Sequence, residues 1–255
     1  ELYKYRDLLL TLTAHRVKVR YKQSILGVAW AIVQPFSLML IYTLIFTYIA
    51  RVPMTGTTPY PIVLYSALLI WTFFSTALTS ATNGLVSHTH LVTKVYFPRE
   101  ILPLSYVLAG LFDLLIASPI LIGLMIYYGV PISIYALYAI PIALILTVVL
   151  TSVSLVLSAA QVHFRDIGMA LPLVLQIWMF ASPVVYPLSA VPERFRAWYL
   201  LNPMAGIVEN FRRVLVEAAP PNFAELGIAA LIAVVFLPIA YIIFKHTEAK
   251  IADVI

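Results

Sequence analysis

Basic side chains gather near the start of the chain, at a spacing that suits the binding of an anion. Arg16 and Arg20 are four residues apart, as are Lys18 and Lys22, so each pair shares one face if the segment is helical. Arginine and lysine hold phosphate groups through charge-assisted hydrogen bonds. Leucines recur at helical spacing ahead of them, and segment 1–24 is therefore predicted to be an amphipathic helix in a membrane interface.

Two alternatives for this segment stay open. The alternation Arg–Val–Lys–Val–Arg from Arg16 to Arg20 also fits a β-strand, because side chains on a strand repeat every two residues. A plain topology anchor attracted to anionic lipids would carry the same charges. The sharper hypothesis is a helix that contacts both a cytoplasmic partner and an anionic lipid headgroup.

The motifs of self-contained catalysis are missing from the sequence. It has no cysteine, which removes thiolate zinc sites and cysteine nucleophiles. None of its 9 glycines is followed by lysine, so there is no Walker A phosphate loop, and HExxH, GxSxG and GxGxxG are also absent. His88 and His90 are two residues apart and do not share a helix face, so a metal site is not expected. We expect no catalytic residue, metal or cofactor in this chain.

Composition points to the membrane. The 255 residues are 62% hydrophobic and 11% charged, whereas a typical soluble domain is about 45–50% apolar and about 25% charged. A helix needs about 20 apolar residues to cross a bilayer. The sequence therefore predicts an all-α integral membrane protein with six transmembrane helices. The expected spans are 26–50, 60–81, 101–128, 134–161, 169–187 and 226–244.

The span 169–187 is irregular. It is expected to be a helix from about Met169 to Ala181, followed by a bent or re-entrant piece from Ser182 to Pro187, because each proline removes a backbone donor. Non-helical backbone at membrane depth persists only where it is buried in protein or faces a water-filled cavity. This piece is therefore a candidate for the wall or mouth of a passage.

Asp113 is the one acid placed deep in a clear span. With no partner evident from the sequence, it is expected to be hydrogen-bonded at a helix interface, and a role as a relay or substrate ligand is the less favoured alternative. Ion-coupled transporters usually carry several intramembrane charges. Any energy for pumping is therefore expected to come from another chain.

The distribution of basic residues predicts the orientation. Six crossings place both ends on one side, and if that side is cytoplasmic the 16 lysines and arginines divide into 11 inside and 5 outside. The positive-inside rule then predicts that both termini are cytoplasmic. The polar segment 83–98, a helix expected to end at Pro98, and the tail 245–255 would lie on the same side.

The segment 192–219 is expected outside, as an amphipathic helical hairpin. Asn202 followed by proline is a strong helix start, with asparagine as the N-cap. Glu209 with Arg213, and Arg213 with Glu217, have the spacing of ion pairs on one helix face. Such a hairpin could cover an exit, although a surface helix with a satisfied charged face would show the same pattern.

Aromatic side chains are frequent in the spans. An aromatic face fits the C–H face of a sugar ring, so a passage for glycans could use them, although packing is the more common role of any single aromatic residue. The candidates for such a passage are Tyr42, Phe46, Trp71, Phe74, Trp178 and Phe180.

Several segments taken together resemble one known family. They are YKQSILGVAWAIVQP, LVTKVYFPREILPL, the turn from His163 to Asp166, and SPVVYP followed by VPERFRAWYLLNPM. In this order they are similar to the transmembrane subunits of ABC-2-type exporters, and among those to the Wzm-like polysaccharide permeases. The resemblance covers essentially the whole chain.

The resemblance implies a homodimer paired with two ATPase subunits that bind Mg-ATP. The implied substrate is a polysaccharide linked to undecaprenyl pyrophosphate, of the O-antigen kind, moved from cytoplasm to periplasm across the bacterial inner membrane. Membrane lipid is a further expected partner, and nucleic acid is not. Capsule or teichoic acid as substrate, and less favourably an ion-coupled secondary transporter, remain alternatives.

The resemblance also suggests roles for particular residues. In the family the segment 83–98 acts as gate and coupling helix, and 192–219 forms periplasmic gate helices. Residues expected to contact the ATPase are His88, Lys94, Phe97, Pro98, Arg99, Glu100, Arg165 and Asp166. Residues expected to bind the lipid pyrophosphate are Arg16, Lys18, Arg20, Lys22, Lys94 and Arg99. The expected periplasmic gate residues are Tyr186, Trp198, Asn202 and Arg212.

Overall fold

The computed structural model describes residues 4–22, 24–49 and 58–254, and every regular element in these ranges is helical. Parts of the expected segments 1–24, 26–50 and 245–255 lie outside the described residues. The α-helices are α1 (Arg6–Lys22), α2 (Trp30–Thr43), α3 (Tyr60–Asn83), α4 (Thr89–Lys94), α5 (Ile101–Tyr127), α6 (Ala139–His163), α7 (Asp166–Phe180), α8 (Glu193–Leu200), α9 (Pro203–Leu215) and α10 (Phe223–Val254).

Five of the expected spans coincide with helices that are long and apolar enough to cross a membrane. These are Gly27–Thr47, Tyr60–Asn83, Ile101–Tyr127, Ile134–His163 and Phe223–Glu248. The first combines α2 with a short 3₁₀ turn before it and a π-helical turn after it. The last belongs to α10, which stays helical to Val254, through much of the segment expected to be a tail.

The helix in the region of the expected span 169–187 is too short to cross a membrane by itself. Helix α7 has 15 residues, which is about 22 Å of helix against about 30 Å of hydrocarbon. Residues 181–187 that follow it are not helical, in agreement with the bent piece expected from Ser182 to Pro187. The sixth crossing therefore stays a prediction.

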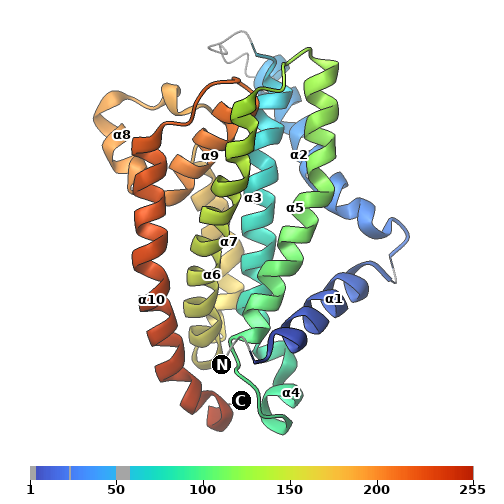
Figure 1. Ribbon diagram of the computed structural model, residues 1–255, viewed down its shortest axis with the longest axis vertical. Coiled ribbons are helices and arrows are strands. Elements are labelled where there is room, and N and C mark those ends of the chain that lie inside the picture. Colours follow the sequence, from blue (N-terminus) through green and yellow to red (C-terminus); the bar gives the residue numbers. More distant parts are fainter. Residues whose placement is uncertain (1–3, 23, 50–57, 255) are drawn as a thin grey trace.

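Helix α3 forms the centre of the bundle (Figure 1). It packs against α2, α5, α6, α7 and α9, and 16 of its 24 residues are buried. The main apolar core is built around these residues. Such a helix is surrounded by other helices over most of its circumference, which explains why its sequence is apolar nearly all round.

The two ends of the bundle are different. Helices α1 and α4 and the end of α10 lie at one end, whereas α8 and α9 lie at the other (Figure 1). Helix α1 crosses α5 obliquely, with Leu8, Leu9 and Leu12 against a second, smaller core. The α-helix is continuous to Lys22, so the strand alternative for the basic residues is not realised.

Two details of the polar segments differ from expectation. The helix expected over 83–98 is broken, because a 3₁₀ turn at Val86–His88 precedes α4, and the backbone is already extended at Val95. The segment 192–219 does contain two helices, α8 and α9, and the Asn202 side chain accepts a hydrogen bond from Met204 N as the predicted N-cap.

The prediction of an ion pair between Glu209 and Arg213 was wrong. Glu209 pairs with Arg212 at 2.7 Å, and Arg213 Nε instead donates to the Pro220 carbonyl at 2.6 Å. Arg212 is almost fully buried and also donates to the Pro183 carbonyl. A guanidinium that is buried without a carboxylate costs more free energy than one in contact with water. Glu209 therefore pairs with the buried Arg212.

Close packing of α3 against α5 gives a first prediction. A Cβ atom added at Gly110 would lie 2.7 Å from the Ala77 Cβ, whereas one added at Gly123, on the same helix, would meet nothing within 4 Å. We expect Gly110→Ala to cost about 1–3 kcal/mol through overpacking and to lower the thermal unfolding temperature in detergent. Gly123→Ala should leave it unchanged or raise it, and equal effects of the two changes would contradict the close approach.

Candidate functional site

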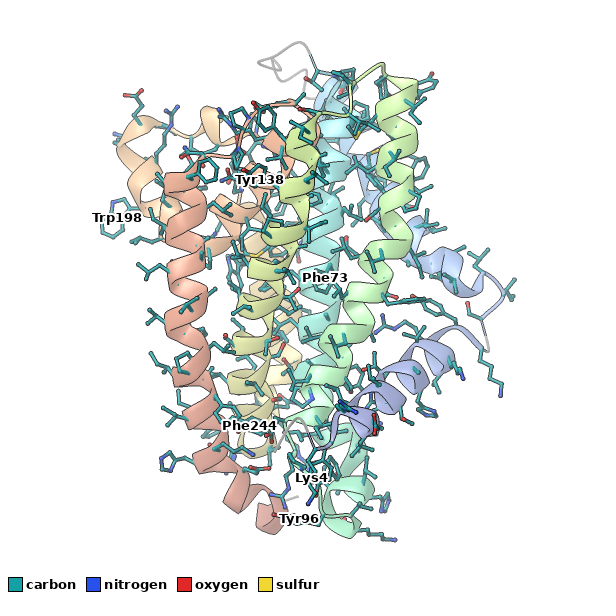
Figure 2. The ribbon with its side chains drawn as sticks, in the orientation of Figure 1. Lys4, Phe73, Tyr96, Tyr138, Trp198 and Phe244 are labelled. Atoms are coloured by element: carbon teal, nitrogen blue, oxygen red, sulfur yellow. The ribbon has the colours of Figure 1, made fainter. Side chains whose placement is uncertain are left out.

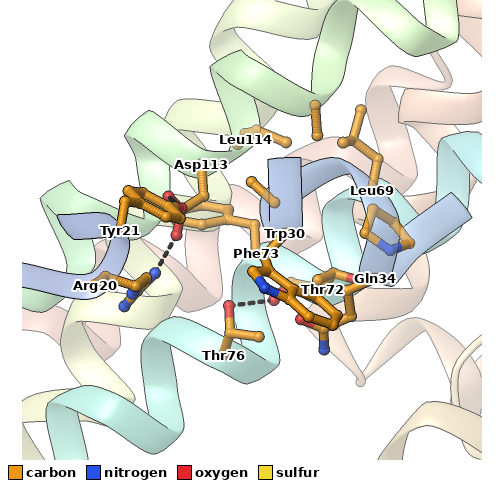
Figure 3. Close-up of a pocket in the computed structure, with 13 residues that line it drawn as sticks. Arg20, Tyr21, Trp30, Gln34, Leu69, Thr72, Phe73, Thr76, Asp113 and Leu114 are labelled. Carbon is orange, nitrogen blue, oxygen red and sulfur yellow. Dashed lines mark hydrogen bonds and ion pairs between the residues drawn. The ribbon is translucent and has the colours of Figure 1, made fainter. Parts of the chain in front are cut away.

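An ion pair fixes the basic end of α1 to the middle of α5. Arg20 Nη1 pairs with the Asp113 carboxylate, and Tyr21 donates its hydroxyl hydrogen to the same group (Figure 3). The pair is shielded, with 31% of the Arg20 side chain and 15% of the Asp113 side chain exposed. Burial, and next the hydrogen bond to Asp113, raise the pKa of Tyr21 to about 12, so its hydroxyl stays a donor at neutral pH. Asp113 is thus hydrogen-bonded at a helix interface, as the sequence predicted.

Arg16 joins three elements at the end of the bundle that holds α4. Its Nη1 donates to the Tyr106 hydroxyl at 2.6 Å and lies 2.8 Å from His88 Nε2, and its guanidinium is 3.9 Å from the centre of the Tyr106 ring. His88 Nδ1 is 3.0 Å from the Gly84 carbonyl. Burial, and next the charge of Arg16, lower the pKa of His88. A neutral His88 can accept from Arg16 and donate to Gly84, which satisfies both ring nitrogens.

The structure divides the six residues expected to bind the lipid pyrophosphate. Arg16 and Arg20 are held by partners inside the protein, and Arg99 donates its backbone N–H to the Glu248 carboxylate at 3.0 Å and its side-chain N–H to the Glu248 carbonyl. The other three side chains are exposed, namely Lys18, Lys22 and Lys94.

The residues expected to contact the ATPase also divide. Glu100 is fully buried and bonded to Lys245 at 2.8 Å, and Phe97 and Pro98 are buried as well. Together with Arg99 they connect the start of α5 to the end of α10, beside a pocket of about 330 Å³. Lys94, Arg165 and Asp166 are exposed. Lys94 is the last residue of α4, Arg165 lies between α6 and α7, and Asp166 is the first residue of α7.

A groove of about 530 Å³ runs between α2, α3 and α7. Two of the six aromatic residues expected in a glycan passage, Tyr42 and Trp71, line it. Phe74 is fully buried and packs edge-on against Trp178, with 5.1 Å between ring centres, which is a packing role. Phe46 packs against Tyr60, with 6.2 Å between ring centres. The sixth, Phe180, is an exposed side chain at the end of α7.

Hydroxyl side chains form the α3 wall of this groove. Between Leu64 and Thr82 every residue of α3 is buried except five, and all five carry a hydroxyl group. These are Thr72, Ser75, Thr76, Thr79 and Ser80, called the hydroxyl face below, and all of them line the groove. They were not among the residues predicted from the sequence, although their spacing of three and four residues is that of one helix face.

A smaller pocket of about 160 Å³ adjoins the groove, with which it shares Gln34, Thr72 and Thr76 (Figure 3). Arg20 and Asp113 lie on its other side. The ion pair between α1 and α5 therefore forms the charged edge of a wall that is otherwise uncharged.

The residues expected to gate the opposite end mostly hold it together. The Asn202 side chain accepts from Trp178 Nε1 at 3.0 Å and donates to Ser182 Oγ at 2.8 Å, so it ties α9 to the end of α7. The hydroxyl groups of Tyr186 and Tyr199 are 2.8 Å apart. Trp198 differs from these residues, because it points away from the bundle with 72% of its surface exposed (Figure 2).

The ion pair at Asp113 can be tested through the position of α1. Asp113→Asn removes the carboxylate that pairs with the partly buried Arg20. We expect this change to lower the free energy of unfolding by at most about 3 kcal/mol, because Arg20 still reaches water. The chain has no cysteine, so a spin label on Lys22→Cys reports on α1 alone, and the variant should make it more mobile.

Two further variants control this experiment. Arg20→Gln combined with Asp113→Asn should lose less stability than the two single changes added together, as expected of a coupled pair. Asp7→Asn removes an aspartate of the same helix whose side chain is 90% exposed, and it should have no effect. An unchanged label in Asp113→Asn would show that the pair does not hold α1.

Comparison with known proteins identifies the family. The chain matches the family described as ABC-2 type transporter over residues 7–216. It is 33% identical over 256 residues to the O-antigen export system permease protein RfbA of Myxococcus xanthus, covering 99% of this chain and 97% of that protein. It is 27% identical to RfbA of Klebsiella pneumoniae over 98% of this chain and 95% of that protein. The polysialic acid transport protein KpsM of Escherichia coli is 24% identical over 91% of this chain and 90% of that protein.

The match to the family covers well over half of the chain, and it includes the basic face of α1, the hydroxyl face of α3 and the groove beside α7. Together with its apolar bundle of long helices, this makes the protein a multi-pass membrane member of the ABC-2 type transporter family.

Proposed function

We propose that the chain is the permease subunit of an exporter that moves a lipid-linked polysaccharide, of the O-antigen kind, out of the cytoplasm. The observation that carries the proposal is the groove, in which two aromatic side chains and the hydroxyl face occur together in a membrane-spanning bundle. Aromatic faces and hydroxyl groups are the chemistry that suits sugar rings. The similarity to RfbA proteins over nearly the whole chain supports this substrate class.

The groove is open along one side, and a closed passage needs a second wall. In the proposed exporter a second copy of this chain supplies that wall through a two-fold axis, since homodimers of this symmetry are the commonest oligomers. Two ATPase subunits, which bind Mg-ATP, contact the α4 end of the bundle, where Lys94, Arg165 and Asp166 are exposed. Both termini then face the cytoplasm of a bacterium, and α8 and α9 face the periplasm.

The lipid carrier in this proposal is undecaprenyl pyrophosphate. Its charged headgroup would bind to the exposed lysines of α1, because Arg16 and Arg20 already have partners. The similarity to KpsM favours capsular polysaccharide as the second candidate substrate. An ion-coupled transporter is less favoured, because the carboxylate of Asp113 is already paired with Arg20.

A reconstitution experiment tests the source of energy. The purified chain alone should not hydrolyse ATP, because it has no Walker A motif. In vesicles with an ABC-type ATPase from the same genome it should export lipid-linked polysaccharide when ATP is present. Replacing the Walker A lysine of the ATPase should abolish this export. Hydrolysis by the chain alone, or export that follows a proton gradient without ATP, would refute the proposal.

The headgroup site gives a separate prediction. We expect Lys18→Gln with Lys22→Gln to weaken binding of undecaprenyl pyrophosphate about tenfold, since each charged hydrogen bond contributes about 1 kcal/mol or more. Binding can be measured with the purified protein in detergent. Lys4→Gln, at another exposed lysine close to the start of α1, is the matched control. The same loss in both variants would favour a general attraction to anionic lipid.

A further inference from the structure

The groove between α2, α3 and α7 lies in a part of the bundle that contains almost no charge. Its described lining residues include no Asp, Glu, Lys or Arg. The sequences of α2 and α3 have none along their whole length, and α7 has one, Asp166, at its first residue. An ion that entered this region would lose much of its hydration and find no opposite charge in its place.

Three hydroxyl groups of the groove already donate their hydrogens to the backbone of α3. Thr76 Oγ1 donates to the Thr72 carbonyl at 2.7 Å, Thr79 Oγ1 donates to the Ser75 carbonyl at 2.8 Å, and Ser75 Oγ donates to the Thr72 carbonyl at 3.4 Å. The first of these bonds is drawn in Figure 3. A hydroxyl group has one hydrogen to donate and two lone pairs. These three groups therefore present acceptors to the groove and have no hydrogen left for a ligand.

Such a wall distinguishes between kinds of glycan. A neutral sugar carries hydroxyl groups, each of which can donate to an acceptor on α3. An ionised carboxylate, as in sialic or uronic acids, only accepts, so at Ser75, Thr76 and Thr79 it would face lone pairs. The other donors of the groove are neutral, and they cannot balance one negative charge in every repeat of a polymer. They are the hydroxyl groups of Tyr42, Thr72 and Ser80, the amide groups of Gln34 and Gln176 and the indole of Trp71.

We propose that the hydroxyl face of α3 is a glycan-binding surface that accepts uncharged polysaccharides and discriminates against polyanionic ones. The inference rests on the proposed export function and makes its substrate class narrower. The charged residues that would bind the carrier lipid are separate from this surface. Lys18, Lys22 and the Arg20–Asp113 pair lie outside the groove, at or beyond its charged edge. The lipid headgroup and the glycan would therefore be bound by different parts of the chain.

The test compares two defined glycans in cells that contain the full exporter and no other. One strain makes a neutral polymannose and the other makes polysialic acid, both on undecaprenyl pyrophosphate, and antibodies measure each polymer at the cell surface. We expect export of polysialic acid to be at least about tenfold lower than that of polymannose. Equal export, or export of polysialic acid alone, overturns the inference and leaves the export function intact. Export of neither polymer overturns the proposed function and the inference with it.

Variants of the hydroxyl face test the acceptor role directly. Thr76→Val with Thr79→Val keeps the side-chain shape and removes two acceptors, and it should lower polymannose export about three- to tenfold. The matched control is Thr147→Val on α6, because Thr147 is also half-buried and also donates to the carbonyl four residues earlier, at 2.7 Å. Export that is unchanged in the double variant, or reduced as much by the control, overturns the acceptor role.

A change of charge completes the experiment. Gln176 is an exposed side chain of the groove, so Gln176→Lys adds a cation to the groove without displacing packed side chains. This variant should raise the ratio of polysialic acid to polymannose export, whereas Gln176→Met, of similar length and uncharged, should not. A ratio that Gln176→Lys leaves unchanged would show that charge in the groove does not select the substrate.

Discussion

The burial of α3 is the constraint on which the other features depend. A helix satisfies its own backbone in a membrane, so its side chains decide what each face can contact. Most of the exposed side chains in the middle of α10 are large and apolar, for example Leu231, Val234 and Ile239, as a lipid-facing surface requires. Between Leu64 and Thr82, the uncovered face of α3 carries hydroxyl groups only. That contrast within one bundle means that α3 does not turn its open face to lipid, and the groove follows from it.

The groove is uncharged because its lining residues are uncharged, and the charged residues at its edge and elsewhere in the bundle are paired. Arg20 and Asp113 pair at the edge near α1, Lys245 and Glu100 pair at the start of α5, and Arg212 is paired on α9 at the opposite end. Each pair also joins two elements or two turns of the chain. A buried charge that lost its partner would be costly, so these pairs hold the helices of the bundle together, and the Arg20–Asp113 pair also leaves the edge of the groove without net charge.

Sequence patterns identified the local features and missed the long-range ones. Hydropathy located five spans, and Asn202 before a proline predicted the start of α9 correctly, because both signals lie within a few residues. The pairing of Arg20 with Asp113 joins residues 93 positions apart, which no local spacing can show. The hydroxyl face was visible as a spacing of three and four residues, but the aromatic residues nearby gave a stronger signal for the same function.

The ion pairs expected along α9 show why spacing alone can fail. Arg212 and Arg213 are adjacent, and the sequence favours Arg213 as the partner of Glu209 because four residues separate them. The structure chooses Arg212, since the turn at Pro183 packs over that side of α9 and removes Arg212 from water. Burial depends on the whole fold and not on the helix, so a rule for isolated helices does not contain it.

The junction at Arg16 connects the end that holds α4 to the wall of the groove. Arg16 on α1 bonds Tyr106 on α5 and His88, which lies between α3 and α4. The carbonyl oxygen of Gly84, directly after α3, accepts a hydrogen bond from Nδ1 of a neutral His88. A displacement of α4 must therefore either break the contacts of His88 or carry the end of α3 and the hydroxyl face with it. Because the hydroxyl face lies on α3, a displacement of α4 that keeps the contacts of His88 also moves the helix that lines the groove.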